Sequence, residues 1–303
     1  MSIEIRLLKT LEECDQFQKV ERLIWGGDDE GIVPTHVLIT LARNGGLVMG
    51  AFAPDGPLQT GGLVGIVAGW LGSAIPPGES VARVKFCSHM AGVLPGWQRR
   101  HVGMRLKLAQ RDWVLEHGFT DWMTWTYDPL YRANGVFNIH RLGAVSRTYI
   151  RDLYGEMTDV LNAGGPSDRC QVDWWLRSER ATSAVARASE SGAQPQVATM
   201  PPVLTANNHA AARYPGLRVL GARSCGTFRQ PLGETFVADG RPVAVPIPDD
   251  IAALRRHDRA LALEWRYYVR SVLEEAYAAG YVMVDCVHIA GQDWCYVLLP
   301  AGR

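Results

Sequence analysis

The chain has 303 residues, of which 31 are Lys or Arg and 31 are Asp or Glu, so its formal net charge is zero. This length suits about two domains. With 47% apolar and 20% charged residues, the chain is not wholly disordered, since disorder needs low hydrophobicity and a high net charge. The charge balance also disfavours a polybasic nucleic-acid-binding protein, because neutralising phosphates normally takes a large positive excess.

The sequence predicts neither a membrane protein nor a metalloprotein. Its most apolar stretch, Leu63–Ile75, is short and contains three glycines, whereas a membrane span needs roughly 20 apolar residues. The first residues lack the layout of a secretory signal. The six cysteines include no C-x-x-C pair, which is typical of reduced thiols in a cytoplasmic protein. Cys87 and His89 could share a strand face, but no second pair has ligand spacing, so no metal is expected.

Hydrophobic periodicity predicts alternating strands and helices in the first part of the chain. The expected strands are 1–11, 47–53, 63–71, 80–94, 121–127, 145–154 and 170–176, and the expected helices are 12–25, 102–117 and 130–142. The segment His36–Arg43 fits either a short helix or the approach to a strand.

A stretch rich in Ala, Ser, Gln and Gly follows and predicts a linker. Beyond it we expect short strands between Leu217 and Val245, a long helix over Asp250–Ala279, and a closing hairpin of Tyr281–Val287 and Trp294–Leu299. The expected division is a first domain at 1–178, a linker at 179–200 and a smaller C-terminal α+β domain at 201–303.

The sharpest chemical signal lies where the strand 80–94 meets the helix that begins at Val102. The chain there reads Val93-Leu94-Pro95-Gly96-Trp97-Gln98-Arg99-Arg100-His101-Val102-Gly103-Met104. A helix N-terminus leaves backbone N–H groups without partners and carries partial positive charge. Arg99, Arg100, Arg105 and Lys107 are close by, and no carboxylate occurs between Gln98 and Arg111. The pattern predicts a phosphate site; a solvated basic turn is the alternative.

In this context the sequence resembles motif A of the GCN5-related N-acetyltransferases, the GNAT superfamily. That motif is Gln/Arg-x-x-Gly-x-Gly/Ala after an apolar strand ending in Val-x-Pro; Gln98 falls on its first position and Gly103 on its last. The following helix, strand and helix, closing on Leu142-Gly143-Ala144, continue the family order over roughly residues 1–176. Runs such as K-F-C-S-H-M-A-G-V-L-P and W-R-Y-Y-V-R are also similar to a bacterial subgroup of predicted acetyltransferases with an extra C-terminal domain.

The resemblance implies an α/β (α+β) fold with a GNAT-like mixed, mostly antiparallel sheet flanked by helices. It also implies direct transfer of an acetyl group from acetyl-CoA to the amine of a small acceptor. Coenzyme A would lie between strands 80–94 and 121–127, with its pyrophosphate on the N–H groups of residues 98–104 and its thioester carbonyl polarised by N–H groups near Val93. The implied cofactor-binding residues are Val93, Leu94, Gln98, Arg99, Arg100, His101, Val102, Gly103, Met104, Asn134 and Asn138.

Two positions depart from the family pattern. His101 stands at the first motif glycine, although its backbone N–H remains available to a phosphate. Ile139, followed by His140, stands where many members have a tyrosine that protonates the departing thiolate. Because a thiol has a pKa of about 8.5, CoA can leave as a thiolate, so an acid helps but is not required.

The attacking amine must lose a proton, and several side chains could accept or supply one. Candidate bases are His89, on the strand that faces the expected coenzyme A site, and Glu156 or Asp159 beyond the second helix. Candidate acids are His140 and Tyr154. A lone histidine among apolar residues is often a core side chain, and Tyr154-Gly155-Glu156 also fits a turn, so the sequence leaves these roles open.

The second region is less informative. Trp265, Arg266 and Arg270 of its long helix fit a cover over the acceptor site or ion pairs with acidic residues of the first domain. A helix that only shields half of a sheet gives the same pattern, and this interpretation is favoured. Its helix–Gly–strand order is compatible with a degenerate acetyltransferase half, but it has no motif loop to bind CoA. Exposed edge strands are compatible with a homodimer. The alternative function is a non-catalytic acyl-CoA-binding protein of the same fold, which His101 and Ile139 favour.

Overall fold

The computed structural model describes residues 3–26, 31–76, 78–155, 165–191, 213–289 and 293–302. Its strands are β1 (Glu4–Leu7), β2 (Leu47–Phe52), β3 (Leu63–Ala74), β4 (Arg83–Val93), β5 (Trp122–Tyr127), β6 (Val145–Ile150), β7 (Arg169–Trp175), β8 (Arg218–Val219), β9 (Ala222–Cys225), β10 (Phe228–Pro231), β11 (Val243–Ile247), β12 (Tyr281–His288) and β13 (Trp294–Pro300). Its helices are α1 (Leu11–Trp25), α2 (Thr35–Arg43), α3 (Val102–His117), α4 (Arg132–Gly135), α5 (Glu179–Ser191), α7 (Ile251–His257) and α8 (Arg259–Ala278), with short turns η2 (Leu58–Thr60) and η3 (Pro95–Trp97) and the π-helical η4 (Val136–Arg141).

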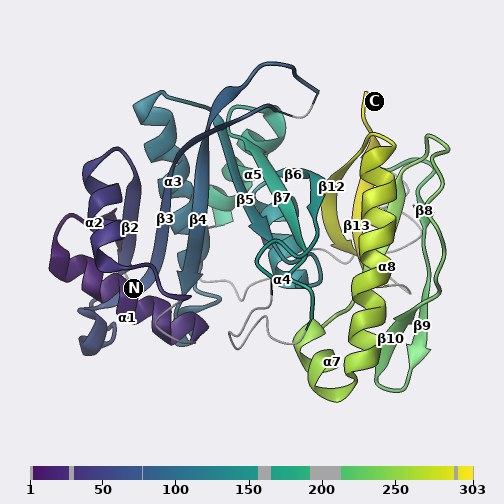
Figure 1. Ribbon diagram of the computed structural model, residues 1–303, viewed down its shortest axis with the longest axis horizontal. Coiled ribbons are helices and arrows are strands. Elements are labelled where there is room, and N and C mark those ends of the chain that lie inside the picture. The colour runs from purple at the N-terminus through teal and green to yellow at the C-terminus, as the bar shows by residue number, and fades with distance from the viewer. Residues whose placement is uncertain are drawn as a thin grey trace.

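The described residues form one 11-stranded sheet in the order β1-β2-β3-β4-β5-β7-β6-β12-β13-β11-β8, and β9 and β10 form a separate ribbon (Figure 1). Neighbouring strands are antiparallel, apart from the parallel pairs β4–β5 and β8–β11. This mixed, mostly antiparallel sheet with helices packed on it confirms the expected fold class.

Helices cover both faces of the N-terminal half of the sheet. α1 begins with a capping box, in which Thr10 Oγ1 accepts the N–H of Glu13 and the Glu13 carboxylate accepts the N–H of Thr10. A Cβ on Gly92 would lie 2.5 Å from a ring atom of α1, whereas a Cβ on Gly65 would lie 3.0 Å from side chains of α3. α1 and α3 therefore pack closely on opposite faces of the β3–β4 pair.

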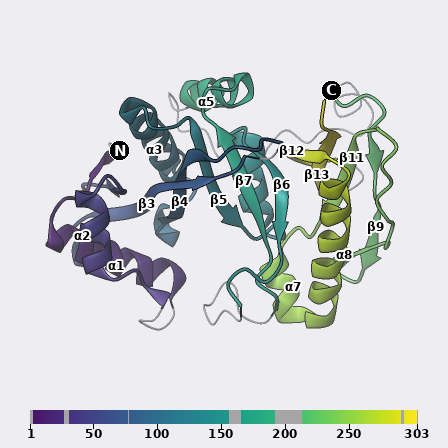
Figure 2. The same ribbon diagram turned by 45° about the horizontal axis from the view of Figure 1, so that its top comes forward.

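β3 and β4 continue together beyond the rest of the N-terminal half as a hairpin arm, dark blue in Figure 2. Their ladder runs on to Ala74 and Arg83, whereas β2 stops pairing with β3 at Gly69. Two cations of the arm, Arg83 and Lys85, each lie 5.5 Å from the ring centre of a tryptophan, on β7 and β5 respectively. The arm is thus anchored over the middle of the sheet.

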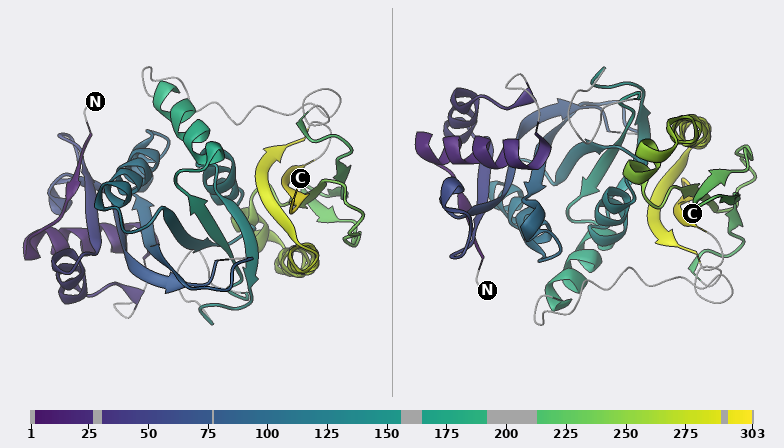
Figure 3. Two further views of the ribbon diagram at one scale, coloured as in Figure 1. Left: turned by 90° about the horizontal axis from the view of Figure 1, so that it is seen from above. Right: turned by 90° about the horizontal axis from the view of Figure 1, so that it is seen from below.

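The C-terminal half adds β12, β13, β11 and β8 to the same sheet. β6 and β12 meet at a single ladder pair, Ser146 with Met283. Figure 3 shows the strands curving from one half into the other, with α5 and α8 on opposite sides of the sheet. The hydrophobic core likewise runs through both halves, from Phe17 of α1 to Trp265 of α8.

Ion pairs brace this junction. Asp128, which follows β5, is 4% exposed and lies 2.6 Å from Arg266 and 3.2 Å from Arg255. Asp168 at the start of β7 accepts two hydrogen bonds of 2.8 Å from Arg270. The arginines of the long helix thus pair with acidic residues of the first half, which is one of the roles that the sequence left open.

The expected linker 179–200, for which the sequence also allows a helical start, begins with α5, which packs its Ala181 and Ala184 into the protein. Residues 192–212 lie outside the described part. The expected helix 130–142 starts late and changes its winding, as α4 followed by η4, because the Asp128 carboxylate accepts the N–H of Leu130 and shapes a turn there.

The long helix expected over 250–279 is two helices. Asp258 takes an extended conformation between α7 and α8, and its carboxylate accepts the N–H of Leu261 at 2.9 Å. Aspartate is a strong N-cap, so it starts a new helix where periodicity alone predicts continuation. The segment His36–Arg43, left open by the sequence, is part of the helix α2. Among the described residues, no helix is long and apolar enough to cross a membrane.

Candidate functional site

The central feature of the candidate site is the divergence of two neighbouring strands, β4 and β5; the region between their diverging ends is called the opening. These parallel strands form ladder pairs only at Phe86 with Met123 and at Cys87 with Thr124. From Ser88 and Trp125 onward the two strands have no ladder pair with each other, so they diverge toward their carboxyl ends. The strands predicted to hold the acyl donor are therefore next to each other and open toward the loop that follows β4.

The edge of β4 that faces this opening offers backbone donors. Leu94 N–H donates to Val64 O across the β3–β4 pair at 3.0 Å. Because N–H groups alternate along an antiparallel ladder, the N–H groups of Val93 and Ala91 point the other way, into the opening. The N–H of Val93 therefore faces away from β3, whereas the backbone N–H of Leu94, also expected to bind cofactor, is already used within the sheet.

Two residues of the loop after β4 have a left-handed backbone conformation. Arg99 has φ 63° and His101 has φ 61°, conformations that cost a non-glycine residue roughly 1–2 kcal/mol each. The Gln98 side chain folds back and its Nε2 donates to Val93 O at 3.3 Å. The loop therefore takes glycine-like backbone angles at His101, where the family motif has glycine, even though the side chain differs.

The N-terminus of α3 is open. His101 occupies its N-cap position without a side-chain hydrogen bond to the helix, so the first N–H groups of the helix lack an intrahelical partner. A Cβ on Gly103 would meet only Val93, at 3.6 Å. The exposed side chains of Arg99 and Arg100 lie on the loop beside it, and the Arg100 guanidinium stacks 4.6 Å from the Trp97 ring centre. This arrangement suits a phosphorylated group.

Two of the cations expected at the phosphate site, Arg105 and Lys107, lie elsewhere, as does Arg111 further along the helix. Arg105 Nη2 donates to Ile3 O at 2.5 Å, Arg111 Nη2 donates to Leu176 O at 3.1 Å, and Lys107 points into the protein. Successive helix positions are 100° apart, so closeness in sequence does not place these side chains together. The positive charge at the loop is that of Arg99 and Arg100.

Lys107 lies between α3 and the diverging strands, and not at the phosphate loop where the sequence predicts it. It is 3% exposed, and its Nζ donates to Ser88 Oγ at 2.7 Å and to Gln110 Oε1 at 3.1 Å. It also lies 3.8 Å from the ring centre of Trp125. Burial lowers the pKa of this ammonium from 10.5 to about 7. The available signal was its spacing of four residues after Gly103 and three before Gln110, which puts the three on one helix face.

Of the two asparagines expected to contact the cofactor, Asn138 lies nearer the opening. Its Oδ1 accepts the Nε1–H of Trp125 at 3.2 Å, and it is 5% exposed. Asn134 is exposed on α4, one turn earlier. Val102 and Met104 bury their side chains, so at these two positions only the backbone is available to a ligand.

Two of the candidate proton-transfer residues lie on or against the diverging strands. The imidazole of His89 lies against Trp70, with ring centres 4.9 Å apart and the rings tilted by 39°, next to an irregularity in the β3–β4 register. Desolvation lowers the pKa of His89, which favours the neutral ring that can accept a proton. The hydroxyl of Tyr154 lies 3.1 Å from Thr126 Oγ1 of β5, although its side chain is 52% exposed.

His140 faces the C-terminal half. Its Nδ1 is 2.7 Å from Asp285 Oδ1 of β12. Asp285 is fully buried, accepts a hydrogen bond of 2.6 Å from Tyr214 and lies 3.2 Å from Arg213. Although burial alone would raise the pKa of Asp285, these partners hold it below its usual value. The carboxylate therefore orients the imidazole, leaving Nε2 as the ring nitrogen available for chemistry. The candidate bases Glu156 and Asp159 lie outside the described residues.

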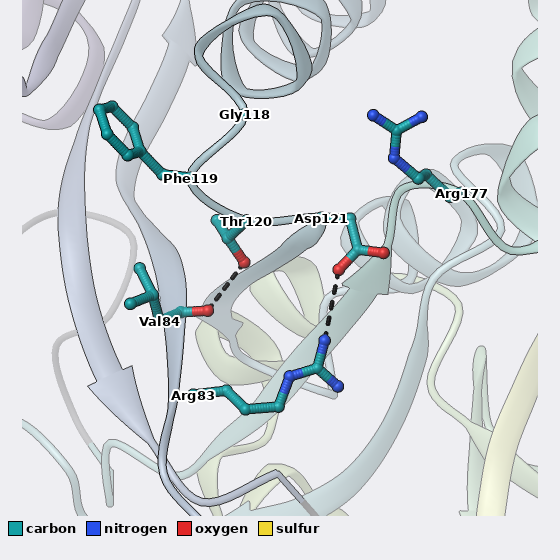
Figure 4. A pocket seen from close by; sticks show the side chains of 7 residues that line it. All are labelled: Arg83, Val84, Gly118, Phe119, Thr120, Asp121 and Arg177. Atoms are coloured by element: carbon teal, nitrogen blue, oxygen red, sulfur yellow. Dashed lines mark hydrogen bonds and ion pairs between the residues drawn. The ribbon is translucent and has the colours of Figure 1, made fainter.

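A cleft of about 400 Å³ lies at the opposite end of β4 (Figure 4). Its lining residues are Arg83, Val84, Gly118, Phe119, Thr120, Asp121 and Arg177. The Arg83 guanidinium lies 3.6 Å from the Asp121 carboxylate, and Thr120 donates to Val84 O at 2.7 Å. Arg83 begins β4 and Val93 ends it, about 30 Å away at the usual strand rise, so this cleft is separate from the opening.

No family model and no curated protein sequence matches the chain. Among solved structures, it is similar to NAA60 of Arabidopsis thaliana in complex with acetyl-CoA, with 11% identity, 58% of this chain and 100% of that chain covered, and a TM-score of 0.44. It is also similar to the ribosomal-protein-S18-alanine N-acetyltransferase from Escherichia coli (13% identity, 57% and 93% covered, TM-score 0.42). The third is the PaiA N-acetyltransferase from Thermoplasma acidophilum in complex with coenzyme A (18% identity, 58% and 99% covered, TM-score 0.39).

Proposed function

We propose that the chain is an acyl-CoA-dependent N-acyltransferase that transfers an acetyl group from acetyl-CoA to the amine of a small acceptor by direct attack. The observation that carries the proposal is the divergence of β4 from β5 next to the open N-terminus of α3. An extended pantetheine arm can enter such an opening, and a pyrophosphate can bind at its mouth.

The residues present fit this donor. The free N–H groups at the start of α3, together with Arg99 and Arg100, hold the pyrophosphate. Gly103 leaves room for phosphate oxygens near the backbone. The N–H groups of Val93 and Ala91 bind along the arm and polarise the thioester carbonyl, which makes its carbon more electrophilic.

His89 is the proposed proton acceptor for the attacking amine. Its lowered pKa keeps the ring neutral near pH 7, and a base must be unprotonated to accept a proton. Tyr154, against β5, and His140, oriented by Asp285, are the alternative partners for proton transfer. The six cysteines are all free thiols, which supports a reducing compartment such as the cytoplasm as the place of action.

The second candidate function is binding of acyl-CoA without catalysis. His101 and Ile139 favour it, because the first puts a side chain at the phosphate loop and the second replaces the family's usual proton donor with a fully buried apolar residue. The two candidates share the donor site and differ in turnover.

Calorimetric titration with acetyl-CoA, followed by measurement of CoA release with a panel of small amines, tests both. Binding with amine-dependent release supports the transferase. Binding without release over the whole panel favours the non-catalytic function, and no binding of acetyl-CoA or CoA contradicts both.

A double variant locates the site. Arg100→Ala with Gly103→Leu removes a cation and fills the space beside the helix N-terminus, so acetyl-CoA should bind at least about tenfold more weakly. Arg43→Ala is the matched control, because Arg43 is an exposed arginine at the end of α2. Unchanged affinity in the double variant would refute this placement.

A further inference from the structure

Lys107 is a buried cation with no carboxylate among its contacts in the described structure. Its Nζ contacts Ser88 Oγ, Gln110 Oε1 and the face of Trp125. Buried charges in proteins are normally paired, since leaving one unpaired is costly. A lysine retained in such a place is therefore either neutral for part of the time or matched to an anion that a ligand brings.

Lys107 lies at the vertex of the opening. Ser88 is the first residue of β4 beyond its last ladder pair with β5, and Trp125 is the first residue of β5 beyond the same pair. Lys107 touches both. Its amino group therefore lies beside the point from which the two strands diverge.

The polar cluster around Lys107 has more donors than acceptors. Gln110 Oε1 accepts from both Ser88, at 2.9 Å, and Lys107. Gln110 Nε2 is fully buried and has no hydrogen-bond partner among the described residues. The cluster therefore fits an added acceptor, and best an anionic one.

The other groups around Lys107 leave its charge uncompensated. Cys87 of β4 is the titratable group that acts on it, and burial raises the pKa of that thiol, so Cys87 stays neutral near pH 7. Trp125 from β5, and Asn138 from η4 behind it, carry no charge.

We propose that Lys107 stabilises the thiolate sulfur of coenzyme A as it leaves. This inference rests on the proposed function, because that function brings the thioester to the opening. The anion that matches Lys107 is then one that develops during the reaction and is absent from the bound donor, which is how a charged group lowers a barrier rather than only tightening binding.

The acceptor nitrogen bonds to the carbonyl carbon and loses a proton, and the carbon–sulfur bond breaks with its electron pair passing to sulfur. The Lys107 ammonium pairs with that sulfur, so CoA leaves as a thiolate. The proton released by the acceptor passes to His89 or to water.

The test compares binding of CoA with binding of desulfo-CoA, which keeps the phosphates and lacks the sulfur. At about pH 8, the protein should bind CoA at least about tenfold more tightly than desulfo-CoA, since a charge-assisted interaction with a thiolate is worth at least that factor. Ultraviolet absorbance of the bound thiolate should appear at lower pH than in free CoA, whose thiol has a pKa of about 8.5.

In Lys107→Met, desulfo-CoA should bind as before, the tenfold preference should fall to about threefold or less, and the absorbance shift should vanish. Lys107→Gln, which keeps polarity without charge, should behave in the same way. It also provides the test if Lys107→Met does not fold. Lys85→Met is the matched control, because Lys85 also lies on a tryptophan ring, that of Trp122.

The outcomes separate the two proposals. If neither CoA nor desulfo-CoA binds, the proposed function is wrong. If both bind but the preference and the absorbance shift survive in Lys107→Met and Lys107→Gln, the role of Lys107 is overturned while the donor site stands.

Discussion

Replacing Lys107 with Met should stabilise the protein at neutral pH, although the change removes two hydrogen bonds. The ammonium is 3% exposed and contacts only uncharged groups, and burial lowers its pKa from 10.5 to about 7. Folding near pH 7 therefore requires this side chain to give up much of its charge or to keep it at a cost. Methionine is also long and unbranched, so it fits the same space without that penalty.

The magnitude follows from proton linkage. The unfolded chain keeps the ordinary pKa of 10.5, whereas the folded chain has about 7, so between these values the unfolded state holds more protons. The contribution of Lys107 to stability therefore improves as pH rises through this window. At about 1.4 kcal/mol for each factor of ten in proton affinity, its penalty is about 5 kcal/mol below pH ~6, about 4 kcal/mol at pH ~7, and close to zero above pH ~10.5.

Losing the two hydrogen bonds offsets about 2 kcal/mol of the gain, so Lys107→Met should be about 2 kcal/mol more stable at pH ~7. Urea unfolding of both proteins at several pH values between about 7 and 10 measures the difference, in which groups common to the two proteins cancel. The gain should shrink steadily as pH rises. If the variant is less stable at pH ~7, or if the difference in stability does not depend on pH, then Lys107 is not a buried ammonium with a lowered pKa.

Three further variants test the rest of the structure. Asp128→Asn leaves Arg266 buried without its ionised partner and should lower the free energy of unfolding by about 3–5 kcal/mol, measured by urea unfolding; a loss below about 1 kcal/mol would contradict the pairing. His101→Gly relieves a left-handed residue and should be neutral to about 1 kcal/mol stabilising, with tighter binding of acetyl-CoA in calorimetry; weaker binding would show that the imidazole itself contacts the phosphates. Asp285→Asn removes a carboxylate whose pKa lies below its usual value. Wild type loses that stabilisation only as pH falls through the lowered pKa, so the variant should be less stable at pH ~7 and converge with wild type in acid; equal stability at both pH values would rule this out.

The sequence predicts best those elements whose hydrophobic periodicity agrees with the residues that start and end them. The helix over Val102–His117 has the expected bounds, because Gly118 in the left-handed conformation ends it. The helix expected at 250–279 is wrong in one respect, since apolar spacing continues through Asp258 while its carboxylate caps a new helix. Periodicity records which face is buried and does not record a change in helix direction.

In the site, too, some features could be predicted from the sequence and others could not. The left-handed conformation at His101 occurs where the motif has its first glycine, whereas the one at Arg99 falls on an unrestricted position of the motif. Side-chain directions did not follow from the local sequence. Arg105 and Lys107 are two residues apart, yet one bonds to the N-terminal segment and the other lies at the vertex of the opening. The contacts between β6 and β12, or between Asp128 and Arg266, join residues far apart in the chain, which local patterns cannot reveal.

The two sides of the opening depend on different halves of the chain. β4 is held by its long ladder with β3 and by α3. β5 is held by β7, and directly after it Asp128 is fixed by Arg266 of α8. The π-helical η4, which carries Asn138, packs on β12 through His140 and Asp285. Because packed interiors transmit displacements rather than absorb them, the C-terminal half sets where the β5 side stands. The ion pairs between the C-terminal half and the β5 side therefore help to fix the width of the opening.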